Sequence, residues 1–273
     1  MAEEKSVPSL KTYRGNCNCG AFRYSVKLPP FEEVTACNCS ICAKKSYLWS
    51  FPISADVFVV EKGDGTLKSY EFGRKKMMHK CCPECGTAVM GQMHGGPDIG
   101  LNVRTIQDLD LDKLKKRTHD GAAIEPAYDA PVGPKPSIAD ASKQSYRGSC
   151  HCGKVTFELQ SEPLNDLEVT DCNCNICARN GYLWIYPSSD AVQLQGEESL
   201  RHHSRYYKSD DKVAGHGFCF TCGVFVLNKL GPEAHPGIMP INVRAINGVN
   251  LDGLKIKKHD GKTLTGKPYV LDE

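Results

Sequence analysis

The sequence contains no apolar run approaching the ~20 residues with which a helix crosses a bilayer. Its opening stretch, MAEEKSVPSLKTYRG, lacks the apolar core of a secretory signal. Charge imbalance is also small, because the formal net charge is only +2, so nothing points to nucleic acid as a partner. These absences predict a protein that stays in the reducing cytoplasm, with the nucleus as the other possibility, and that makes no contact with a membrane.

Cysteine, by contrast, is abundant, with fifteen residues in a chain of 273. Disulfides are disfavoured in a reducing compartment. Free thiols at this density would be open to oxidation. Metal binding is the remaining common reason for such a composition, and the positions of the cysteines favour it.

The chain repeats itself after about half its length. The matching segments are YRGNCNCG from Tyr13 and YRGSCHCG from Tyr146, CNCSICAKKSYLW from Cys37 and CNCNICARNGYLW from Cys172, HKCCPECG from His79 and HGFCFTCG from His216, and LNVRTI from Leu101 and INVRAI from Ile241. Between the copies, PVGPKPSIADASK is rich in Pro and Ala and is typical of a linker. We therefore predict tandem domains at 1–130 and 144–273, joined by a linker at 131–143.

Within each copy the apolar pattern is that of β-strands. FRYSVKL places Phe22, Tyr24, Val26 and Leu28 at a period of two. VFVV, LKSYEF, TAVM and IGLNVRTI are further strand candidates, with Gly or Pro between them. No segment has the periodicity of a long amphipathic helix. The predicted fold is mainly β with few short helices, and metal would help to tie its sheets together.

Seven cysteines recur in register in each copy, and they divide into four and three. A CxC motif and a distant CxxCG turn would together surround one ion with four thiolates, the closed shell of a structural zinc site. This set is Cys17, Cys19, Cys82 and Cys85 in the first copy and Cys150, Cys152, Cys219 and Cys222 in the second. Only Cys81 lacks a counterpart, because Phe218 takes its place.

The remaining CxCxxC motifs supply three thiolates each, from Cys37, Cys39 and Cys42 and from Cys172, Cys174 and Cys177. Three protein ligands and an open position form a typical catalytic zinc site, and a soft ion favours an incoming thiol. The alternative is a closed site completed by His, Asp or a bound thiol. Iron–sulfur clusters also use four cysteines. Zinc at all four sites would bring the chain to a net charge of about −4, which argues further against nucleic acid.

Other side chains near these motifs allow two interpretations each. His79 and His216 precede the CxxC motifs and fit either a proton shuttle or a strand histidine bonded to backbone. Arg104 and Arg244 could bind a substrate carboxylate or pair with a nearby Asp.

The sequence also leaves the roles of the aromatic and turn residues near these motifs undecided. Trp49 and Trp184 follow the CxCxxC motifs and could wall a pocket or pack in the core. The HDG sequences at His119 and His259 are most simply predicted as hairpin turns.

The motifs YRGNCNCG, CNCSICAKKSYLW, HKCCPECGT and LNVRTI…HDG resemble the glutathione-dependent formaldehyde-activating enzyme family, and within it the branch that includes centromere protein V. The resemblance implies a β-tent-like fold with two zinc sites per domain, hence four Zn²⁺ per chain. It implies that the four-cysteine sets hold structural zinc. It also implies that the CxCxxC cysteines hold a second zinc to which glutathione can bind.

The resemblance also implies an activity. We expect a carbon–sulfur lyase-type enzyme that acts on glutathione, or another small thiol, together with a carbonyl electrophile. Formation of S-(hydroxymethyl)glutathione from formaldehyde is the family reaction, and the six CxCxxC cysteines would be the catalytic ones. The alternative is a non-catalytic zinc-binding module for chromatin or protein interactions.

Overall fold

The structure is a computed structural model that describes residues 9–124, 126–134, 142–203, 215–230 and 235–264, together with Tyr269 and Leu271. Part of the predicted linker, 135–141, lies outside the described residues, so the linker boundaries stay a prediction. Among the described residues every helix is too short, or too polar, to cross a membrane.

The first copy is built from short strands, 3₁₀ turns and one short helix. Its elements are β1 (Lys11–Asn16), β2 (Arg23–Leu28), β3 (Glu33–Cys37), α1 (Ser40–Lys45), β4 (Trp49–Ser54), η1 (Ala55–Val57), β5 (Phe58–Lys62), β6 (Lys68–Tyr70), β7 (Met77–Cys81), β8 (Ala88–Met93), β9 (Asp98–Asn102), η2 (Val103–Thr105), β10 (Lys115–His119) and η3 (Gly121–Ala123).

The second copy repeats this order with small changes. Its elements are β11 (Gln144–Ser149), β12 (Thr156–Ser161), β13 (Glu168–Cys172), α2 (Asn175–Asn180), β14 (Trp184–Ile185), η4 (Ser189–Ala191), β15 (Val192–Gln195), η5 (Glu197–Ser199), β16 (Leu200–His203), β17 (Gly215–Cys219), β18 (Phe225–Lys229), β19 (Ile241–Asn242), η6 (Val243–Ala245), β20 (Lys255–His259) and α3 (Gly261–Leu264).

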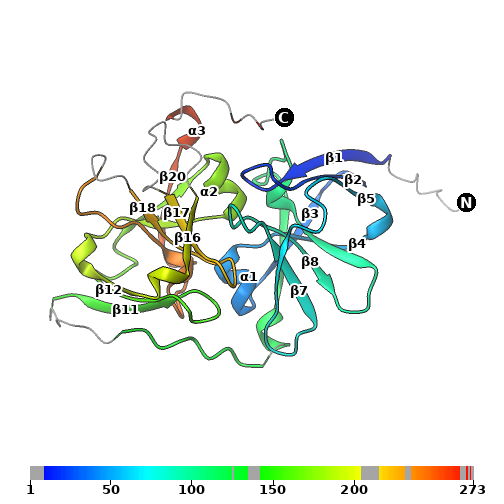
Figure 1. The fold of residues 1–273 in the computed structure, drawn as a ribbon. Helices are drawn as coiled ribbons and strands as arrows, with labels where there is room; N and C mark the ends of the chain where they lie inside the picture. Colours follow the sequence, from blue (N-terminus) through cyan, green and yellow to red (C-terminus); the bar gives the residue numbers. More distant parts are fainter. Residues whose placement is uncertain are drawn as a thin grey trace, which may run out of the picture.

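Each copy contains a three-stranded sheet and a seven-stranded sheet. The small sheets have the orders β1-β2-β5 and β11-β12-β15. The large sheets have the orders β10-β3-β4-β9-β8-β7-β6 and β16-β17-β18-β19-β14-β13-β20. Only the pairs β3–β10 and β13–β20 are parallel among the described ladders. The predicted fold class, mainly β in two tandem domains, is confirmed (Figure 1).

The strand predictions hold best where one face is buried. In β2, Tyr24 and Val26 are fully buried and pair with β1, as their period of two predicts. The segment LNVRTI behaves differently, because β9 ends at Asn102 and the next three residues form η2. LKSYEF is also shorter as a strand than predicted, since β6 covers only Lys68–Tyr70.

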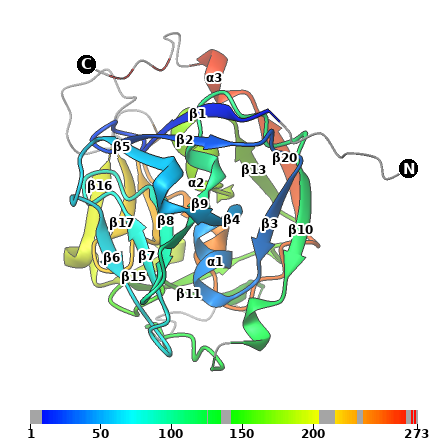
Figure 2. The ribbon, with the colours of Figure 1, turned by 90° about the vertical axis from the view of Figure 1, so that its right-hand side faces the viewer.

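The two copies share a continuous core. Helix α1 packs against η6 of the second copy, and helix α2 packs against η2 of the first. Ile41, Cys42 and Tyr47 belong to the same buried cluster as Cys150 and Val224. Both helices therefore lie where the two lobes meet (Figures 1 and 2).

Candidate metal centres

The predicted four-cysteine sets come together in both copies. Within each set all four Sγ atoms lie within 4.8 Å of one another. In the first copy, Cys19 Sγ lies 3.5 Å from Cys17 Sγ and 3.6 Å from Cys82 Sγ. Four sulfurs about 2.3 Å from a tetrahedral zinc would be about 3.8 Å apart, so the spacing fits the ion. No disulfide joins any of the fifteen cysteines, all of which are among the described residues.

Backbone geometry explains why the motifs converge. In each CxxCG turn the glycine adopts a left-handed conformation, with φ of +69° at both Gly86 and Gly223. This lets the Gly86 N–H donate to the Cys82 carbonyl at 2.9 Å and closes the turn. On the CxC side, the Phe22 N–H donates to Cys17 Sγ at 3.3 Å. Such a donor favours a thiolate over a thiol, as a metal ligand requires.

The predicted three-cysteine sets also come together, each at the junction of a strand and a helix. Cys37 ends β3, Cys39 is the N-cap residue of α1, and Cys42 lies within that helix. Their three Sγ atoms lie within 4.8 Å of one another, as do those of the second copy. Among the described residues, no fourth His, Cys, Asp or Glu joins either group. All four clusters could hold a metal ion.

The indoles of the two tryptophans contact these clusters directly. Trp49 Nε1 donates to Cys42 Sγ at 3.3 Å, and Trp184 Nε1 donates to Cys177 Sγ at 3.4 Å. Both rings are buried. The tryptophans therefore pack in the core and also hold one sulfur of each three-cysteine set, or trio. The core and pocket-wall interpretations of these residues are not exclusive.

The thiols of each trio differ in acidity. Hydrogen bonds from Cys39 and Cys42 lower the pKa of the Cys37 thiol. The hydrogen bond with Cys37 and burial raise the pKa of Cys42 well above its usual value. Cys37 is only partly buried, whereas Cys39 and Cys42 are buried, so Cys37 is the member nearest solvent.

The HDG segments do not form hairpin turns, contrary to the prediction. Strand β10 runs parallel to β3, and the chain then turns into η3 beside the trio. The turn is tied down by Asn38, whose Nδ2 donates to Asp120 Oδ1 at 2.8 Å and whose Oδ1 accepts from the Ala122 N–H at 2.9 Å. Asn173 and Asp260 make the equivalent bond in the second copy. The sequence around HDG could not predict this arrangement, because the parallel partner strand of β10, which is β3, is distant in sequence.

Gly121 is needed where that turn passes the sulfurs, and we predict a selective effect of Gly121→Ala. The added methyl group would lie 2.4 Å from Cys37 Sγ. It should displace that sulfur without strain in the backbone, because Gly121 has no left-handed φ. The expected result is the loss of one metal ion per chain with the circular dichroism spectrum unchanged.

Gly96→Ala is the control for Gly121→Ala, since its methyl group would meet only Met93 Cβ at 3.8 Å. An unaltered metal content in Gly121→Ala, measured by mass spectrometry of the intact protein, would contradict the placement of an ion at this trio.

The two histidines before the CxxC motifs are buried beside the trios. Burial and then the Lys45 ammonium lower the pKa of His79 to about 3, and burial lowers the pKa of His216 to about 3. His216 Nε2 lies 4.0 Å from Cys177 Sγ. A pKa near 3 makes both rings weak bases at pH 7, which disfavours the proton-shuttle interpretation.

The arginines of the NVR motifs donate to backbone carbonyls and pair with no carboxylate among the described residues. Arg104 Nε donates to the Ser46 carbonyl at 2.7 Å, and its Nη1 donates to the Ala178 carbonyl of the second copy at 3.1 Å. Arg244 Nε donates to the Gly181 carbonyl at 2.7 Å. Both guanidinium groups thus brace the last turns of α1 and α2.

Tyr47 and Tyr182 were not singled out by the sequence. Each hydroxyl is buried and has no hydrogen-bond partner among the described residues. Tyr47 stacks on Trp49 with ring centroids 4.1 Å apart, which places it beside Cys42. Burial, and next the charge of Cys42, raise the pKa of Tyr47 well above its usual value, so the hydroxyl keeps its proton.

The fold and these clusters define a class of protein: a β domain, present twice, whose four-thiol and three-thiol clusters could each hold a metal ion. A family model described as glutathione-dependent formaldehyde-activating enzyme matches residues 12–120 and again 145–258. The chain therefore belongs to the glutathione-dependent formaldehyde-activating enzyme family, in two tandem copies.

One similar solved structure is the crystal structure of a Rhodobacter sphaeroides protein. It is 25% identical over 38% of this chain and 99% of that chain, with a TM-score of 0.34.

Proposed function

We propose that the chain is a zinc-dependent carbon–sulfur lyase-type enzyme that combines glutathione with formaldehyde, with two catalytic and two structural ions. Family membership supports a reaction of glutathione and formaldehyde. The observation that carries the catalytic assignment is the contrast between the clusters. The four-cysteine sets, or quartets, supply a complete tetrahedral shell, whereas each trio has three sulfurs and no fourth ligand among the described side chains.

In this proposal Cys37, Cys39 and Cys42 hold one catalytic ion, and Cys172, Cys174 and Cys177 hold the other. Zinc held by three thiolates would supply a Lewis-acidic position that favours a further soft ligand and lowers the pKa of a thiol placed there. The four-cysteine sets hold the structural ions, which fasten the sheets.

The chain's own groups prepare the trio for this chemistry. The indole N–H of Trp49 holds the Cys42 sulfur, and the Cys39 amide N–H lies 3.5 Å from the Cys37 sulfur. These donors draw charge from the thiolates, so that the sulfurs bind an ion without quenching its Lewis acidity. Gly121 leaves the space beside Cys37 that any other residue would fill.

The reaction itself moves one proton and two electron pairs. The thiol sulfur forms a bond to the aldehyde carbon, and the π pair of the carbonyl moves to its oxygen. That oxygen takes up the proton that the thiol gave away, so nothing is oxidised or reduced. The protonated hydroxyls of Tyr47 and Tyr182 are the buried groups that we assign as hydrogen-bond donors to this oxygen, and they keep their own protons.

Metal analysis of single-site variants tests the proposal. The parent chain should carry four zinc ions, and Cys39→Ser and Cys174→Ser should each lose one while keeping the parent's circular dichroism spectrum. Exchange of ¹³C-formaldehyde with S-(hydroxymethyl)glutathione, followed by NMR, should slow in each variant and fall to the uncatalysed rate in the double variant. Tyr47→Phe should slow the exchange without changing the metal content.

The non-catalytic alternative makes the opposite predictions. An interaction module would leave the exchange rate at the uncatalysed value in the parent chain. If Cys39→Ser and Cys174→Ser each unfolded the protein, both trios would have to be counted as structural.

A further inference from the structure

The helix that carries each trio is held by the other copy. Lys44, in the last turn of α1, is buried, and its ammonium has three acceptors in the second copy. Its Nζ donates to the Ser149 carbonyl at 3.1 Å, to the Ala245 carbonyl at 3.1 Å and to Asn247 Oδ1 at 2.8 Å. All three donors of the ammonium are satisfied, which a buried charge requires.

Arg179 occupies the same position in α2 and makes the reciprocal contacts. Its Nη1 donates to the Asn16 and Thr105 carbonyls of the first copy, both at 2.9 Å. Asn16 and Thr105 are the repeat counterparts of Ser149 and Ala245, so the two cations bind equivalent carbonyls. Asn16 Oδ1 also accepts from Arg179 Nη2 at 3.3 Å and from Gln107 Nε2 at 2.9 Å.

These acceptors adjoin the quartets. Ser149 directly precedes Cys150, and Asn16 directly precedes Cys17. His151, between the ligands Cys150 and Cys152, lies 2.9 Å through Nε2 from the hydroxyl of Ser40, which is next to Cys39. Each quartet loop is therefore the surface on which the trio helix of the other copy rests.

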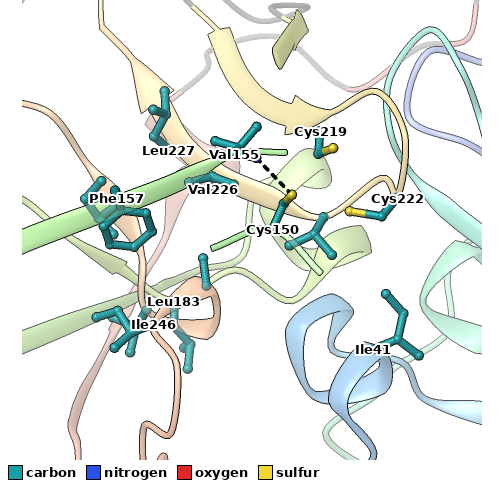
Figure 3. Packing of buried hydrophobic residues seen from close by; sticks show 14 of the residues in the cluster. Ile41, Cys150, Val155, Phe157, Leu183, Cys219, Cys222, Val226, Leu227 and Ile246 are labelled. Carbon is teal, nitrogen blue, oxygen red and sulfur yellow. Dashed lines mark hydrogen bonds between the residues drawn. The ribbon is translucent and has the colours of Figure 1, made fainter. Parts of the chain in front are cut away.

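The apolar contacts run in the same direction. Ile41 of α1 is fully buried and belongs to the cluster that contains Cys150, Cys219 and Cys222. Figure 3 shows Ile41 beside the loop that bears Cys222. Since α1 and α2 are six residues each, and helices this short are unstable alone, tertiary contacts must fix them.

We infer that the two kinds of cluster depend on each other across the domain interface. The loop that carries the quartet of each copy positions the trio of the other copy, with Lys44 and Arg179 as the positioning residues. Neither trio is complete as a rigid site without the opposite domain. As an account of a catalytic site this inference rests on the proposed function. As an account of how the thiols are held and shielded it can be tested without any substrate.

Peptide-resolved alkylation of the full-length, metal-loaded chain with iodoacetamide tests whether each copy positions the trio of the other. The two test variants are Asn247→Ala in the second copy, which removes an acceptor of Lys44, and Gln107→Ala in the first copy, which removes the donor that holds Asn16 Oδ1, an acceptor of Arg179. Asn247→Ala should raise the alkylation rate of Cys37, Cys39 and Cys42 about tenfold, since a hydrogen bond to a charged group is lost. The rates at Cys172, Cys174 and Cys177 should stay unchanged. Gln107→Ala should give the reverse pattern with a smaller rise, because Gln107 bonds to Asn16 and not to the charged group of Arg179.

Two results would overturn the inference. One is the same-copy pattern, in which Asn247→Ala exposes Cys172, Cys174 and Cys177 instead. The other is parent-like rates at Cys37, Cys39 and Cys42 in both Asn247→Ala and Lys44→Met, measured in protein with a parent-like circular dichroism spectrum. If each variant exposes the trio of the opposite copy but the chain has no lyase activity, the inference holds and the proposed function is wrong.

Discussion

Cys82→Ser should abolish the cooperative folding of the chain, whereas Cys81→Ser, one residue earlier, should leave it folded. Cys82 is buried, and its sulfur lies within 4.8 Å of the other three sulfurs of the quartet. Cys81 is also buried but belongs to no cluster, and Phe218 takes its place in the second copy. The two variants therefore compare the same chemical change inside and outside a closed thiolate shell.

The expected difference is large because metal binding is coupled to folding. Structural zinc binds with an apparent free energy of about 10–16 kcal/mol in small domains. A whole domain is stable by only about 5–15 kcal/mol. Cys81→Ser places a hydroxyl in a buried site and should cost about 1–3 kcal/mol. Urea unfolding followed by circular dichroism, together with the metal content, would show the contrast.

Removal of the metal should reproduce the Cys82→Ser result in the parent chain. A strong chelator should unfold it, and zinc should restore it. A Cys82→Ser protein with the parent's unfolding midpoint would show that the quartet is not the fastening of this domain.

The sequence was sufficient for the clusters because their ligands repeat in register. The fourteen matched cysteines could be divided into quartets and trios by spacing alone, and the structure brings both kinds of group together. The surroundings of the sulfurs could not be predicted in this way. The indole of Trp49 and the turn at Gly121 reach the trio through pairing between β3, β4 and β10, and that pairing is not encoded in any local pattern.

The domain interface was invisible for a different reason. Lysine and arginine are normally exposed, so a sequence offers no ground for burying Lys44 or Arg179. The helices that carry them are too short to show a helical period. Strand β2, in contrast, buries Tyr24 and Val26 at the period of two that the sequence predicted.

Arg179→Met should lower the free energy of unfolding by about 3–5 kcal/mol, the largest effect that we expect from a residue outside the clusters. The methionine keeps the apolar stem but removes three hydrogen bonds to Asn16 and Thr105 across the interface. Those acceptors would be left in a region closed to water. Urea denaturation of the full chain measures the loss.

Two controls separate the interface contribution from the loss of a charge. Arg117→Met removes an arginine whose side chain is 67% exposed and which pairs with Glu33 at 3.5 Å, so it should change stability by less than about 1 kcal/mol. Arg179→Lys should retain most of the parent stability, because Lys44 already binds the equivalent carbonyls of Ser149 and Ala245 in the other copy. A small effect of Arg179→Met, equal to that of Arg117→Met, would mean that the two domains are stable independently. A large effect that Arg179→Lys reverses would mean that the folding of each domain depends on a cation supplied by the other.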